Sequence, residues 1–138
     1  MRSQARPAQG EKTPQMQRIE EHEKFRRGVE EFNRREFFAA HETLEEIWLK
    51  APEPEKTFLQ GVIQVASAFH HYLKGNHAGA EPLLRRGLEK LEKSPDGYAG
   101  IDVQRLRKKA MWWLEEIAAG RSPVQEELPQ IVAENPRL

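Results

Sequence analysis

The sequence predicts an all-α fold, a single-domain bundle of about five helices built from antiparallel helical hairpins. The acidic residues are nearly all Glu, which favours helix interiors, and only Asp96 and Asp102 are Asp. Apolar residues recur at three- and four-residue steps along most of the chain, which is the period of a helix. No stretch alternates apolar and polar residues as a half-buried strand does.

Length and composition fit one domain with a modest core. The chain has 138 residues, of which 38% are hydrophobic and 32% are charged. Its formal net charge is zero, so no overall field draws it to nucleic acid or to an anionic membrane. It contains no cysteine, which excludes disulfides and cysteine-type zinc sites. Without a secretion signal or a membrane-length apolar run, we expect a cytoplasmic protein that makes no membrane contact.

The sequence predicts a helical bundle domain at residues 14–120 between two tails. Residues 1–13 are polar and contain proline and glycine, so we expect a disordered N-terminal tail. Residues 121–138 contain three prolines, so we expect an extended C-terminal tail that packs Leu128, Ile131 and Val132 on the bundle.

The first two helices should form a hairpin. Thr13 and Pro14 start the first helix as cap and first helical residue, and it ends near Asn33. The second helix follows a very short turn, and Pro52 and Pro54 end it. A connection this short implies antiparallel packing. The apolar residues that predict these helices are Phe25, Val29, Phe32, Phe37, Phe38, Ala40, Leu44, Ile47 and Trp48.

The third helix should be central. It runs from about Pro54 to Lys74 and is apolar nearly all round, which favours burial. Gly75 ends this helix, and Asn76 can cap the next one. Two successive hairpins suggest stacking of the tetratricopeptide type, although the sequence shows no convincing internal repeat.

Two further helices complete the predicted bundle. The fourth covers roughly 77–93, and Pro82 requires either a helix that begins close to it or a distorted first turn. Asp102 caps the fifth helix. Trp112 and Trp113 on this helix cannot both face the core. We expect one of them to cover the C-terminal tail or to form a partner surface that favours self-association.

The middle of the chain carries short motifs in a fixed order. They read FNRREFFAAHETLEEIWL, FLQGVIQVASAFHHYLKGNHAGA and GIDVQRL, and they begin at Phe32, Phe58 and Gly100. In these motifs the sequence resembles the domain-of-unknown-function 309 family of bacteria and plants, over roughly residues 25–115. The resemblance implies an all-α bundle and no established biochemical activity. Pro82 departs from the helix former expected there.

Five polar side chains form the candidate site. His41 and Glu45 are four residues apart and share a helix face with apolar neighbours, so this face should point inward. Gln60, Gln64 and His71 form a polar stripe along the otherwise apolar third helix. Buried polar groups need partners, so we expect the two sets to meet in a buried cluster if the second and third helices pack face to face.

This cluster has three interpretations. In the first it is a structural network in which His41 bonds Glu45 and Gln64 and fixes the helix register. In the second it is a pocket in which Gln60 and Gln64 orient a small polar ligand. In the third, His41, Glu45 and His71 bind a divalent metal, since two histidines and one carboxylate are a known ligand set. The neighbouring His70 faces about 100° away from His71 and is predicted to be a surface or interface residue.

The function predicted from these features is a non-enzymatic helical module that binds a protein partner or a small ligand, with no resident cofactor. No complete catalytic motif is present, which is the main reason. The alternative is a metal-dependent hydrolase with His41, Glu45 and His71 as ligands and Glu42 as general base. Nucleic-acid binding through the fifth helix is a third interpretation, because a basic run lies between Arg105 and Lys109. The neutral chain argues against it.

Overall fold

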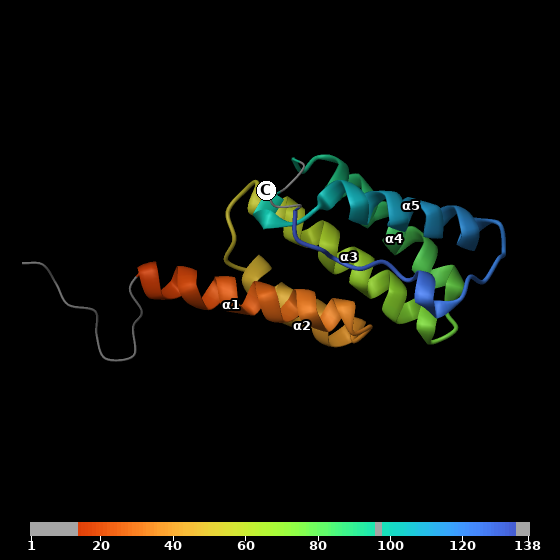
Figure 1. Ribbon diagram of the computed structural model, residues 1–138, viewed down its shortest axis with the longest axis horizontal. Helices are drawn as coiled ribbons and strands as arrows, with labels where there is room; N and C mark the ends of the chain where they lie inside the picture. Colours follow the sequence, from red (N-terminus) through yellow and green to blue (C-terminus); the bar gives the residue numbers. More distant parts are fainter. Residues whose placement is uncertain (1–13, 96–97, 135–138) are drawn as a thin grey trace, which may run out of the picture.

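The structure is a computed structural model that describes residues 14–95 and 98–134. Within these ranges it contains five α-helices, two short 3-10 helices and no strand (Figure 1). This confirms the predicted all-α class. The predicted N-terminal tail, residues 1–13, and the last part of the predicted C-terminal tail, residues 135–138, lie outside the described residues. The elements are α1 (Pro14–Asn33), α2 (Phe37–Trp48), α3 (Glu55–Leu73), α4 (His77–Glu92), η1 (Tyr98–Gly100), α5 (Val103–Ala118) and η2 (Gln125–Glu127).

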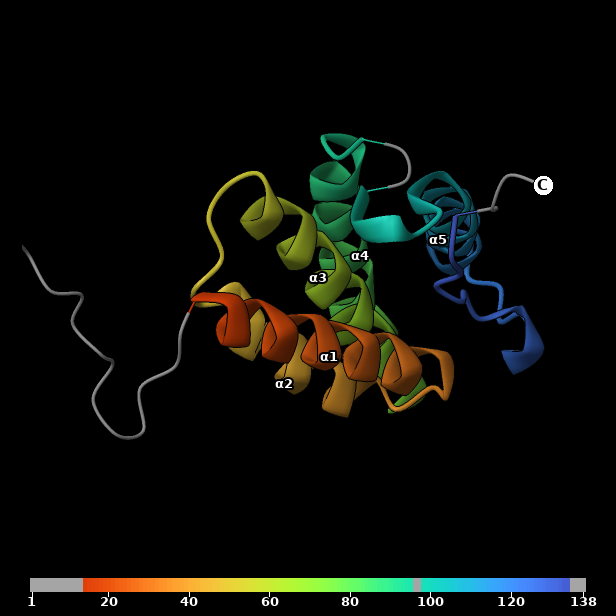
Figure 2. The same cartoon turned by 60° about the vertical axis from the view of Figure 1, so that its left-hand side comes forward.

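Each helix packs on its neighbour in the chain, so α1 contacts α2, α2 contacts α3, α3 contacts α4 and α4 contacts α5. Figure 2 shows α1 and α2 lying side by side against α3. The central position predicted for α3 is confirmed, because it also contacts the two outer helices. Phe58 lies 6.2 Å from Phe25 of α1, and Phe69 lies 5.4 Å from Trp113 of α5, between ring centroids.

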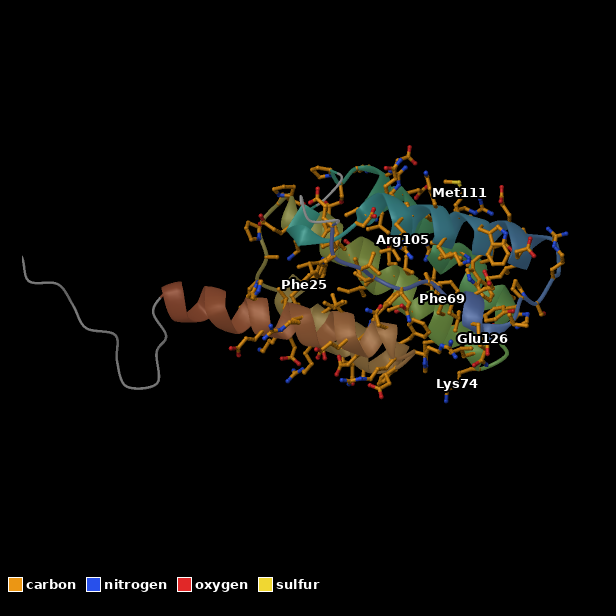
Figure 3. The ribbon with its side chains drawn as sticks, in the orientation of Figure 1. Phe25, Phe69, Lys74, Arg105, Met111 and Glu126 are labelled. Carbon is orange, nitrogen blue, oxygen red and sulfur yellow. The ribbon has the colours of Figure 1, made fainter. Side chains whose placement is uncertain are left out.

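A single hydrophobic core runs through all five helices. Figure 3 shows Phe69 among the helices and Met111 on the outer side of α5. At the α3–α4 contact two glycines allow the backbones to approach closely. A Cβ atom on Gly87 would lie 2.9 Å from Cγ2 of Val65 and 3.0 Å from the carbonyl oxygen of Gly61. The α3–α4 pair therefore depends on the absence of a side chain at this crossing.

The ends of α1, α3 and α5 close in the same way. The second residue after each helix has positive φ, 66° at Arg35, 85° at Gly75 and 76° at Gly120. The next amide donates to a carbonyl five residues earlier, which is the Schellman arrangement. These bonds join Glu36 to Glu31, Asn76 to His71 and Arg121 to Glu116. The ends at Gly75 and Gly120 were predictable, but arginine gives no such signal.

The predicted caps of α4 and α5 are confirmed. The Asn76 side chain accepts from the Gly79 amide at 2.9 Å, and the Asp102 side chain accepts from the Arg105 amide at 3.0 Å. Pro82 does not mark the start of α4, because the helix begins at His77 and continues through it. The lost hydrogen bond is tolerable there, since Pro82 is exposed and water can reach the freed carbonyl.

The two hairpins share a register that the sequence did not reveal. Arg35 and Gly75 close the first helix of each hairpin, with residue numbers offset by 40. The same offset pairs the fully buried Ala40 with Ala80 and Leu44 with Leu84. This supports the repeat-like stacking at the level of structure, with α5 as the first helix of a third, incomplete unit. The match was hidden in the sequence because outward-facing residues of the two hairpins are unrelated.

The segment after α5 returns across the bundle instead of forming a further helix. In Figure 1 it crosses α3 from the end of α5 towards η1. Leu128 and Ile131 are buried, at 6% and 2% exposure, as predicted, whereas Val132 is only partly buried. Trp113 is the tryptophan that contacts this segment: it is fully buried, and its Nε1 donates to the carbonyl of Glu127 at 2.6 Å.

Candidate functional site

Four of the five predicted site residues lie along the surface line where α2 meets α3, namely His41, Glu45, Gln60 and Gln64. The predicted packing of these two helices is confirmed. At one end Lys56 donates to the carbonyl of Trp48 at 3.1 Å, and its Nζ lies 4.4 Å from the centre of the indole ring. At the other end the rings of Phe38 and His70 are 5.2 Å apart. We call this line the α2–α3 seam. Its residues are Phe38, His41, Glu45 and Trp48 of α2, and Lys56, Gln60, Gln64 and His70 of α3.

The predicted burial of the cluster is wrong. His41, Gln60, Gln64 and His71 are only partly buried, and Glu45 is exposed. The one polar residue buried among the described residues is Thr43, at 6% exposure. Helical spacing correctly placed His41 and Glu45 on one face of α2, but it did not predict how deeply that face is buried. The inward face of α2 consists of Phe37, Ala40, Thr43, Leu44 and Ile47, and the polar stripe lies beside that face.

The histidine that meets α2 is His70 and not His71. Phe38 stands between two histidines: its ring centroid lies 5.2 Å from that of His70 and 6.1 Å from that of His41. The His71 ring is instead held at the α3–α4 turn, where its Nδ1 accepts from Nδ2 of Asn76 at 3.3 Å. A signal for this existed in the sequence. His70 lies about four helical turns after Lys56 and so shares the face that begins at the α2–α3 turn.

Three polar atoms of the seam are enclosed without a hydrogen-bond partner in the described structure. They are Nδ1 of His41, Nε1 of Trp48 and Oε1 of Gln64. His41 reaches Glu45 only at 3.8 Å between Nε2 and Oε2, which is an ion-pair distance too long for a hydrogen bond. The proposed bond between His41 and Gln64 is therefore not formed. Such unpaired groups cost free energy and tend to occur at functional positions.

The pKa of His70 in the seam is lowered by its surroundings. Burial lowers the pKa of His70 below its ordinary value of 6.5. The positive charge of Lys74, and that of His71 and His41 when protonated, lower it in the same direction. His70 is therefore neutral over most of the physiological pH range.

The predicted metal ligands are not assembled. In residues 14–95 and 98–134, no three side chains of His, Asp or Glu are grouped so that they could hold one ion. The reason is the orientation of His71, which is bound to Asn76, while His41 approaches Phe38 and His70 instead. The structure thus gives the proposed hydrolase no preformed ligand set in the part of the chain that it describes.

Two clefts lie away from the seam. One of about 800 Å³ is mainly apolar and is lined by α1, α2, the α2–α3 connection, α3 and η1. Its apolar walls are formed by Phe25, Ile47, Phe58 and Leu59. The other lies between α5 and the C-terminal segment, where basic residues including Arg105 alternate with acidic ones. Lys109 there pairs with Glu127 at 2.5 Å, so the basic run is partly neutralised and makes a weak footprint for nucleic acid.

The fold and the seam together define an all-helical scaffold of stacked hairpins. None of its described helices has both the length and the apolar character needed to cross a membrane. The model of the family "Domain of unknown function (DUF309)" matches residues 25–83, which contain α2, α3 and the whole seam. The match agrees with the resemblance seen in the motifs over residues 25–83.

Two relatives carry similar segments within longer chains. An uncharacterised protein of Aquifex aeolicus (strain VF5) is 32% identical over 87 residues, which cover 62% of this chain and 25% of the relative. The uncharacterised protein YpuF of Bacillus subtilis (strain 168) is 37% identical over 59 residues, which cover 42% of this chain and 34% of YpuF. The match therefore spans between a quarter and about a third of the length of these relatives.

Proposed function

We propose that this chain is a non-enzymatic, cytoplasmic interaction module that binds a partner protein through the α2–α3 seam. One observation carries the proposal. Phe38 is 51% exposed although it is a large apolar side chain, and it lies between His41 and His70. Exposed aromatic side chains set among polar ones are typical of the centres of protein interfaces.

A partner protein fits the seam better than a small molecule. The seam extends from Phe38 to Trp48, a length of about 15 Å along α2. Neither of the two described clefts includes a residue of the seam. A long, shallow line of aromatic and amide side chains offers contacts spread along a helix or a strand, whereas a small ligand needs an enclosed cavity.

The proposal is tested by partner binding with variants of the seam. Once a partner has been captured and purified, its affinity is measured for the wild type, Phe38→Ala and His70→Ala. Loss of a central interface side chain should weaken binding at least tenfold. The matched control is Leu49→Ala, because Leu49 is 64% exposed and lies just beyond α2, outside the seam. Equal affinity of all variants would refute the proposal.

A small apolar ligand is a second candidate, favoured by the cleft of about 800 Å³. Its size falls in the range of known ligand pockets, and its walls include Phe25, Ile47 and Leu59. Titration with a hydrophobic fluorophore tests this function. Binding that raises the melting temperature and is lost in Ile47→Asn would support it, and no binding would exclude this class of ligand.

A further inference from the structure

The C-terminal segment is held across the bundle mainly through its backbone. Asn33, at the end of α1, makes two bonds to Ile131: its Nδ2 donates to the carbonyl at 2.9 Å, and its Oδ1 accepts from the amide at 2.7 Å. At the far end of the segment, Asp102 N donates to the Val132 carbonyl at 2.8 Å, and Glu134 N donates to the Gly100 carbonyl at 2.9 Å.

None of these bonds depends on a side chain of the segment. The same holds at its near end, where Trp113 donates to the Glu127 carbonyl. A carboxamide that both donates to and accepts from one residue recognises any extended backbone, as the open edge of a sheet does. The segment is therefore bound through its backbone by Asn33, Asp102 and Trp113. These contacts select an extended conformation and do not select particular side chains.

Besides the ion pair of Glu127 with Lys109, side-chain selectivity comes from two buried positions. Leu128 and Ile131 enter the core, whereas Gln130 between them is exposed. Pro129 is buried and has no amide hydrogen to satisfy. The accepted pattern is thus an apolar residue, a proline, any residue and a second apolar residue, in an extended conformation.

The connection to α5 would allow the segment to leave. The residues from Gly120 to Glu126 are exposed apart from the partly buried Pro123. Repeat-type helical scaffolds use extended concave surfaces for binding. Here α1, α3 and α5 are the first helices of successive units, and the segment crosses α3 between α5 and the end of α1 (Figure 1).

We propose that this groove is a binding site for extended peptides, distinct from the seam. Its external ligand is a segment of a partner protein with two apolar residues three positions apart and proline after the first. Residues 127–134 occupy the groove in cis and compete with that ligand.

The test uses the full chain and a labelled peptide of residues 126–134. The variant Leu128→Ser/Ile131→Ser weakens the cis segment and leaves the groove unchanged. We expect it to bind the peptide at least tenfold more tightly than the wild type does, as measured by fluorescence anisotropy. Adding Asn33→Ala should reverse the gain, and a peptide with both apolar residues replaced by serine should not bind.

Three outcomes would overturn the proposal. One is a folded double variant that binds the peptide and the serine control equally. A second is a dimeric variant whose peptide binding is blocked, which would assign the groove to a second copy of the chain. If the double variant unfolds, amide hydrogen exchange of the wild type decides. The Ile131 and Glu134 amides should exchange at least a hundredfold faster than core amides of α3, and equal protection would show that the segment does not open.

Discussion

Arg35 adopts a backbone conformation that glycine adopts at the two equivalent helix ends. Its φ is 66°, compared with 85° at Gly75 and 76° at Gly120. The hydrogen bond that closes the helix end, from an amide to the carbonyl five residues earlier, is present at all three ends. A side chain in this region costs about 1 kcal/mol, because the Cβ atom crowds the backbone. The sequence could not reveal this site, since the α1–α2 turn imposes the conformation against the preference of arginine.

Arg35→Gly should therefore stabilise the protein by about 1 kcal/mol, a rise of a few degrees in melting temperature. The neighbouring Arg34→Gly is the matched control, because Arg34 has an ordinary negative φ. Glycine there should be neutral or destabilising. Thermal unfolding of both variants checks this, and equal effects of the two substitutions would contradict the explanation.

His70 makes the stability of the fold depend on pH. Its pKa is lower in the folded chain than in the unfolded chain, so the unfolded state binds a proton more readily. The stabilising contribution is present above the ordinary pKa of 6.5 and is lost as the pH falls through the lowered value. His70→Gln should lose less stability than the wild type between about pH 7 and pH 5. Parallel urea titrations at both values test this, and identical losses would refute it.

At the scale of the elements, the helix ends were the most predictable features. Asn76 and Asp102 cap α4 and α5 as their side-chain chemistry requires, and Gly75 and Gly120 end α3 and α5. These signals are local, so the sequence contains them. The depth of the polar stripe was not predictable, because it depends on how far α2 is rotated towards α3. The bond from Asn33 to Ile131 was not predictable either, because it joins residues that are far apart in the sequence.

Gly87→Ala should destabilise the α3–α4 pair, although alanine favours a helix. The new Cβ would meet the Gly61 carbonyl oxygen at 3.0 Å, and a backbone atom cannot move aside without shifting α3. Overpacking of this kind costs about 1–3 kcal/mol. Chemical denaturation gives the value. The control Arg86→Ala changes an exposed neighbour on α4 and should be nearly neutral. Equal effects of the two substitutions would contradict the close contact of Gly87 with α3.

At the scale of the whole molecule, the structure combines a stacked scaffold with two separate surfaces. The α2–α3 seam lies entirely inside residues 25–83, the part that the DUF309 model matches. The groove filled by the C-terminal segment also needs α5, which lies beyond that part. A partner bound at the seam is therefore an expectation for the matched region of the longer relatives. The peptide groove is a property proposed for this chain.

Site-specific photo-crosslinking is the sharpest test of whether a partner protein binds at the seam. A photoreactive phenylalanine analogue is placed at Phe38 in one preparation and at the exposed control Leu49 in another. We predict a discrete crosslinked protein at position 38 that is absent at position 49 and disappears when His70→Ala is added. The same products at both positions, or a product at position 38 that persists with His70→Ala, would contradict the account.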